Sequence, residues 1–174
     1  MRRAFSIFAL VGFFSSLFVH LSTFFGIDPS KHAPWVWVLH IGIFVLFIPM
    51  LFVQGLRPGK DFWNKIFAAM PRWARYAIKF FFAYAIINFA LFFFLSQGGV
   101  PEVRDGKYVL HNHGQVVREL SEKEYEWQKA YVIRGFSGHW MVFYLMAAMV
   151  FWYRGKSAHL ESINTIEEVN DDNP

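Results

Sequence analysis

Four long stretches of this chain contain no charged residue, and they decide its predicted architecture. They are 18 to 23 residues long and cover residues 4–26, 35–55, 80–97 and 136–153. Because a helix rises about 1.5 Å per residue, each stretch can cross a hydrocarbon core about 30 Å thick. A helix in a soluble core does not need to be apolar on every side over such a length. We therefore predict an all-α membrane protein, a four-transmembrane-helix bundle with spans at about 4–26, 35–55, 77–97 and 134–153.

The basic residues gather on one side of these predicted spans. Arg2 and Arg3 precede the first span, six basic residues lie between the second and third, and Arg154 and Lys156 follow the fourth. In contrast, the outer segment 98–135 balances six basic residues with six acidic ones. Cytoplasmic loops carry the excess of lysine and arginine, so this pattern predicts a protein of the cytoplasmic (inner) membrane with both termini in the cytoplasm. The net charge of +4 is accounted for by this topology and does not indicate nucleic-acid binding.

The chain therefore divides into a four-span membrane domain, residues 1–156, and an acidic cytoplasmic tail, residues 157–174. In the inner connection, residues 61–70 predict a short amphipathic helix lying at the membrane surface, with Asp61 as its cap. Its apolar face consists of Phe62, Trp63, Ile66, Phe67 and Met70.

The outer segment predicts a small extracytoplasmic hairpin followed by a helix. Asp105 and Gly106 stand between two short apolar stretches, which is the pattern of a two-residue hairpin turn. A second turn is expected at 112–114, with a returning strand after it. Ser121 and Glu124 have the spacing of a capping box, so a helix is expected to begin there and continue into the fourth span.

Histidines are the main candidates for chemistry in the spans. His20, His40 and His139 lie at a similar depth near the outer face on three different helices. If they converge, they could ligate a haem b or a copper or zinc ion. His111 and His113 in the outer segment are further candidate metal ligands. The alternatives are histidines that only fix helix packing, and a site for a quinone, a lipid headgroup or a proton.

Tyr84 and Asn88 are one helical turn apart on the third span, and they are the other polar pair inside the predicted membrane region. Asparagine in a span commonly forms a hydrogen bond with a neighbouring helix. We expect both residues to serve helix packing.

Several functional classes are excluded or disfavoured by what the sequence lacks. The predicted spans are free of charged residues in their interiors, which disfavours a voltage sensor or a carboxylate-based ion carrier. The absence of cysteine excludes disulfides and thiol chemistry. No phosphate loop, nucleophile elbow or zinc-protease motif is present.

These observations favour a non-catalytic accessory or assembly subunit of a larger membrane complex. Its expected partners are the lipid bilayer and other membrane subunits or further copies of the chain. One alternative is a haem- or metal-binding redox protein that uses the histidine cluster. Another is a transporter or lipid-handling protein that works as an oligomer.

Overall fold

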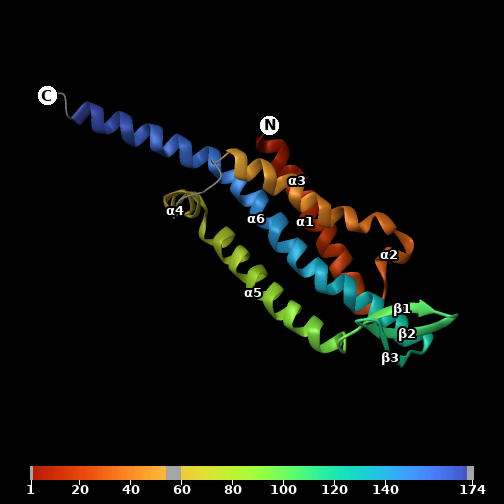
Figure 1. Cartoon of the computed structure of the whole chain (residues 1–174). Helices are drawn as coiled ribbons and strands as arrows, with labels where there is room; N and C mark the ends of the chain where they lie inside the picture. The colour runs from red at the N-terminus through yellow and green to blue at the C-terminus, as the bar shows by residue number, and fades with distance from the viewer. Residues whose placement is uncertain (1, 54–59, 172–174) are drawn as a thin grey trace.

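The computed structural model describes the backbone of residues 2–53 and 60–171 and the side chains of residues 3–48 and 63–153. A helical bundle carries a small sheet at one end (Figure 1). The start of α1, helix α4 and the C-terminal part of α6 lie at the opposite end. The elements are α1 (Arg2–Ser22), η1 (Thr23–Phe25), α2 (Pro29–His32), η2 (Pro34–Trp37), α3 (Val38–Val53), α4 (Lys60–Ala69), α5 (Arg72–Leu95), β1 (Val100–Arg104), β2 (Lys107–Asn112), β3 (Gln115–Glu119) and α6 (Glu122–Asp171).

Within the described residues, three helical segments are long and apolar enough to cross a membrane: Arg3–Phe25, Arg72–Leu95 and Glu122–Tyr153. The second predicted span corresponds to η2 and α3, and α3 itself has 16 residues. That is shorter than the about 20 residues that a membrane crossing usually takes, and residues 54–55 of this span lie outside the described part of the chain. The fourth crossing therefore stays a prediction.

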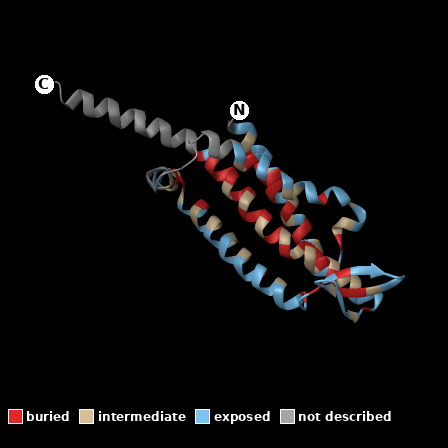
Figure 2. Ribbon diagram, viewed as in Figure 1, coloured by how far each residue is buried: buried red, intermediate tan, exposed pale blue. Residues whose placement is uncertain are grey.

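Helix α6 lies at the centre of the molecule, and α1, α3, α4 and α5 all contact it. Buried residues are concentrated on α6 and on the side of α1 that faces it, whereas α5 is mostly exposed (Figure 2). Trp140 and Tyr144 of α6 are the largest fully buried side chains in the described part of the chain. Beyond Tyr153, the backbone of α6 stays helical through most of the predicted tail, as far as Asp171.

The Tyr144 ring fixes the distance between α6 and its two neighbours. A Cβ atom at Gly12 of α1 would overlap the Tyr144 ring, and one at Gly42 of α3 would overlap its hydroxyl group. The same hydroxyl donates a hydrogen bond of 2.7 Å to the carbonyl oxygen of Leu39. Only glycine at both positions leaves room for this large side chain, so α1 and α3 approach α6 closely here.

Helix α4 forms where the amphipathic helix was predicted, and its apolar face is attached to the bundle. Ile66 and Met70 are each 2% exposed and belong to the same hydrophobic core as Ala74 of α5 and Tyr153 of α6. The helix begins at Lys60, so Asp61 lies within the first turn and is not the cap. Contact with protein accounts for much of the apolar face that the sequence assigned to the membrane surface.

The outer segment forms a three-stranded antiparallel sheet in the order β1-β2-β3, so the chain is mostly helical but not all-α. Asp105 and Gly106 form the first turn as predicted, with φ angles of 51° and 75°. The positive φ at both positions matches the type I′ turn that suits the twist of a hairpin. The second turn is formed by His113 and Gly114.

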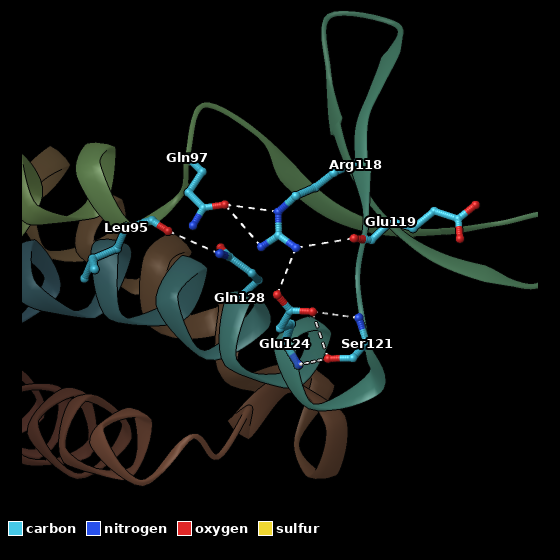
Figure 3. Close-up of polar contacts among 7 residues, drawn as sticks. All are labelled: Leu95, Gln97, Arg118, Glu119, Ser121, Glu124 and Gln128. Atoms are coloured by element: carbon cyan, nitrogen blue, oxygen red, sulfur yellow. Dashed lines mark hydrogen bonds and ion pairs between the residues drawn. The ribbon is translucent and has the colours of Figure 1, made fainter.

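The sheet is tied to the ends of α5 and α6 by the polar network in Figure 3. The Arg118 guanidinium of β3 donates to Oε1 of Gln97 at 3.2 and 3.3 Å and to Oε1 of Glu124 at 2.9 Å. Nε2 of Gln128 donates to the carbonyl oxygen of Leu95, the last residue of α5, at 3.2 Å. One cluster thus joins β3, the end of α5 and the start of α6.

The predicted capping box is confirmed at the start of α6. The Ser121 backbone N–H donates to Oε2 of Glu124 at 2.8 Å, and the Glu124 N–H donates to Oγ of Ser121 at 3.3 Å. These Ser121 donors, together with Arg118, lower the pKa of the Glu124 carboxyl from 4.5 to about 2. Because the folded-state pKa is the lower one, the stabilisation is complete above about pH 4.5 and is lost as the pH falls towards 2.

Replacing the capping residue tests this local arrangement. Ser121→Ala removes the acceptor for the Glu124 N–H, so the start of α6 should lose about 1 kcal/mol of stability. Amide hydrogen exchange across residues 122–130 should become about fivefold faster, since about 1 kcal/mol changes an equilibrium by that factor. Lys123→Ala, an exposed change in the same helical turn, is the control and should leave exchange unaccelerated. Equal exchange rates in Ser121→Ala and the wild type would contradict the assigned role of Ser121.

Candidate functional site

A polar centre lies between α1, α5 and α6, and His20 is in its middle. The His20 side chain is 2% exposed. Its Nδ1 is 2.8 Å from Oγ of Ser137 on α6, and its Nε2 is 2.5 Å from the hydroxyl oxygen of Tyr84 on α5. Both ring nitrogens therefore have partners, each from a different helix.

One assignment of hydrogens satisfies every member of this chain of contacts. Ser137 Oγ lies 3.3 Å from the carbonyl oxygen of Arg134 and donates to it. Ser137 then accepts from Nδ1–H of His20, and His20 Nε2 accepts from the Tyr84 hydroxyl. The chain runs Tyr84, His20, Ser137 and the Arg134 carbonyl, and it leaves no buried donor unused.

Asn88 attaches α5 to the same turn of α6. Its Nδ2 donates to the carbonyl oxygens of Arg134 at 2.9 Å and Gly135 at 3.5 Å. A Cβ atom at Gly138 would overlap the Asn88 amide, so this glycine makes room for the contact. Tyr84 and Asn88, the predicted packing pair, thus both contact groups on neighbouring helices.

The Arg134 guanidinium lies beside this centre. Its Cζ is 4.7 Å from the centre of the Phe24 ring and 4.5 Å from that of the Tyr131 ring. These distances correspond to cation–π contacts. Arg134, Tyr84 and Asn88 all line a pocket of about 170 Å³ whose remaining walls are mainly apolar.

His40 and His139 lie elsewhere in the bundle. Their ring centres are 6.0 Å apart, and Nδ1 of His40 accepts a hydrogen bond of 3.0 Å from Nε1 of Trp140. The His139 ring is hydrogen-bonded to the Gly135 backbone. His139 also lines a second, apolar groove of about 470 Å³ between α5 and α6.

The three histidines that the sequence offered as candidate ligands therefore have different partners among the described residues. His20 is engaged by Ser137 and Tyr84, while His139 lies beside His40. Among the described residues, no group of three or more histidine, aspartate or glutamate side chains is arranged to hold a metal ion. The geometry gives no support to a three-histidine copper or zinc site.

The two outer histidines are also separated in role. His111 lies in β2 with its Nδ1 3.7 Å from Oε2 of Glu102, and its buried Nε2 has no hydrogen-bond partner. His113 is exposed in the turn between β2 and β3. His111 lies beside Glu102 of the neighbouring strand, and the two histidines belong to a strand and a turn respectively.

Ser137 and His20 resemble a nucleophile and base only in their spacing. The Ser137 side chain is fully buried, and His20 is nearly so. No carboxylate is paired with His20; its second nitrogen faces a phenol. A substrate carbonyl could not reach Ser137 without separating the helices, so this arrangement stabilises the bundle and does not suit acyl transfer.

Arg134 is the residue of this region that sequence reasoning missed. It was grouped with the balanced charges of the outer segment because it precedes the charge-free block. One signal was available in the sequence, namely an arginine at the boundary of a span with Tyr131 three residues before it.

No family model, curated protein or solved structure matches this chain, so the site stands on its own geometry.

The hydrogen bond from Tyr84 can be tested with a single-atom change. Tyr84→Phe leaves Nε2 of buried His20 without its partner, and such a bond between membrane helices is worth about 1 kcal/mol. Unfolding in a denaturing detergent should therefore need less denaturant in this variant. Tyr76→Phe is the matched control, because Tyr76 is on the same helix and is 68% exposed. Equal losses in the two variants would show that the His20 contact contributes nothing.

Proposed function

We propose that this chain is a four-pass membrane protein that serves as a non-catalytic accessory or assembly subunit of a larger membrane complex. The observation that carries the proposal is the apolar groove between α5 and α6, together with the unburied surface of α5. The proposed occupant of the groove is a transmembrane helix of another subunit.

Helix α5 has little contact with the rest of the chain for its length. Ala74 and Asn88 are its only buried residues, although all 24 of its residues are described. Much of its surface is aromatic or aliphatic, including Phe82, Ile86 and Phe89, which are 49 to 58% exposed. In a membrane this surface faces lipid or another helix, and these three side chains also line the groove.

A polar atom in the groove favours a protein partner over lipid. His139 is the one polar residue among the nine that line the groove. One nitrogen of its ring is engaged with the Gly135 backbone, and no hydrogen bond of the other is found among the described residues. Polar groups are costly in lipid, and a helix with a donor or acceptor side chain would satisfy this nitrogen.

The outer sheet offers a second surface for the same assembly. Val103 and Val117 are both more than half exposed, and Val100 and Val116 are also exposed. The outer edges of β1 and β3 are unpaired within the described residues, since the sheet ends at these two strands. Exposed apolar residues beside free strand edges are typical of a surface that is covered in a complex.

The proposed orientation places both termini in the cytoplasm and the sheet outside. It rests on the basic residues of the inner connection and on α3 with η2 acting as the fourth crossing. Reporter fusions after Lys156 should give a cytoplasmic signal, and an insertion after Asp105 an external one. An external signal after Lys156 would mean an odd number of crossings and would overturn the four-pass topology.

Assembly can be tested by obstructing the groove. Extraction in a mild detergent should recover the chain in a particle much larger than 20.4 kDa plus its detergent. Ala85→Trp places a bulky ring in the groove and should release the chain from that particle. Ala90→Trp is the control, because Ala90 is exposed on the same helix but does not line the groove, and should leave the particle intact.

A photo-cross-linking residue at Phe89 should join the chain to one defined membrane protein, and Ala85→Trp should abolish that product. Recovery of the wild type as a single chain in several mild detergents would contradict the proposal. Haem absorption, or one metal ion per chain after purification, would instead favour the redox alternative.

A further inference from the structure

The pocket that Arg134, Tyr84 and Asn88 line lies between η1, α5 and α6, near the end of the bundle that carries the sheet. We propose that it binds the phosphate headgroup of an anionic phospholipid, with Arg134 as its charged contact. The pocket has a volume of about 170 Å³ and combines Arg134, Tyr84 and Asn88 with mostly apolar walls. This proposal is independent of the assembly role, because the pocket and the α5–α6 groove have no lining residue in common.

Among the described side chains, the Arg134 charge has no carboxylate counterpart. None of the ion pairs between described side chains includes Arg134. Phe24 and Tyr131 contact the guanidinium through their ring faces at 4.7 and 4.5 Å. Contacts to the rings restrict its plane and leave N–H groups at its edges for a ligand. A planar guanidinium can donate two parallel hydrogen bonds to a phosphate. No carboxylate lines the pocket, so the N–H groups of Arg134 are available for such a ligand.

The backbone that carries Arg134 is held in place before any ligand arrives. Its carbonyl oxygen accepts hydrogen bonds from Nδ2 of Asn88 at 2.9 Å and from Ser137 at 3.3 Å. Asn88 is buried, and Ser137 also contacts buried His20. These residues act on the ligand only through the position of Arg134. A charge whose position is already fixed loses less entropy on binding than a mobile one.

The size and placement of the pocket indicate a headgroup with attached chains. Pockets that enclose a whole small molecule measure about 300–1000 Å³, so this one suits only part of a lipid. Its apolar wall continues onto exposed α5, where Leu91 and Phe94 are 50% and 80% exposed. Arg134 stands two residues before the charge-free block 136–153, at the level where lipid phosphates meet the protein.

Native mass spectrometry of the full chain in a maltoside detergent, titrated with phosphatidylglycerol, tests the proposal. The wild type should retain one tightly bound lipid, and phosphatidylcholine should bind more weakly. Arg134→Gln should weaken retention by about tenfold or more, because charged hydrogen bonds are among the strongest contacts available. Arg134→Lys should retain phosphatidylglycerol more weakly than the wild type and more strongly than Arg134→Gln, because lysine keeps the charge but lacks the planar guanidinium.

Arg104→Gln provides the matched control, because it removes the same charge from an exposed position in β1 outside the pocket. Circular dichroism checks that each variant is folded. If Arg134→Gln fails that check, Leu91→Trp obstructs the pocket while keeping the arginine and should weaken binding as well.

Three results would overturn the proposal. Phosphatidylglycerol could bind equally to the wild type and to the folded pocket variants. Arg104→Gln could weaken the retention of phosphatidylglycerol as much as Arg134→Gln does. Alternatively, sn-glycerol 3-phosphate could displace the lipid at equal concentration, which would identify a soluble phosphate as the ligand.

Discussion

The close approach of α6 to its neighbours depends on one bulky side chain set against two glycines. Tyr144 occupies the space that a side chain at Gly12 or Gly42 would fill, and its hydroxyl is bonded to Leu39 of α3. One helical turn earlier, Trp140 is fully buried and donates to His40 of the same helix α3. In lipid, helices gain little from hydrophobic burial against one another, so close packing and hydrogen bonds decide which faces meet. These two residues therefore set the rotation of α6 for the whole bundle.

That rotation determines what each side of α6 can do. The side with Ser137 faces His20 and supports the polar centre, while His139 lines the apolar groove. Helix α5 lies along the boundary between these regions, and the hydrogen bonds of Tyr84 and Asn88 help to attach it. Each such hydrogen bond is worth about 1 kcal/mol. A helix held in this way keeps most of its surface available to lipid and to other helices.

Features that depend on a few neighbouring residues could be predicted from the sequence. The turn at Asp105 and Gly106 and the capping box of Ser121 and Glu124 are set by local backbone chemistry, and both are present. The third strand was less clear from the sequence, because a short apolar stretch beside a turn does not show which strand it pairs with. In the structure β3 pairs with β2, and this completes the sheet.

Whether the histidines converge could not be predicted, because the sequence gives depth along a helix but not rotation about its axis. Side chains two residues apart on a helix point in directions about 200° apart around its axis. Ser137 and His139 therefore point to different neighbours, although their depths are nearly the same. The rotation of α6 about its axis comes from packing around Tyr144, and no local sequence pattern predicts that packing.

The central position of α6 also bears on how the protein is made. A chain emerges from the ribosome with its N-terminal part first, and the hub of this bundle is the last of its long helices. While α1, α3 and α5 are being synthesised, the carbonyl group that receives the Asn88 amide and the hydroxyl group that meets His20 do not yet exist. The earlier helices lack most of their tertiary contacts until α6 has been made. Formation of the tertiary structure must therefore wait until α6 has been synthesised, and until then the polar side chains of the earlier helices lack their partners on α6.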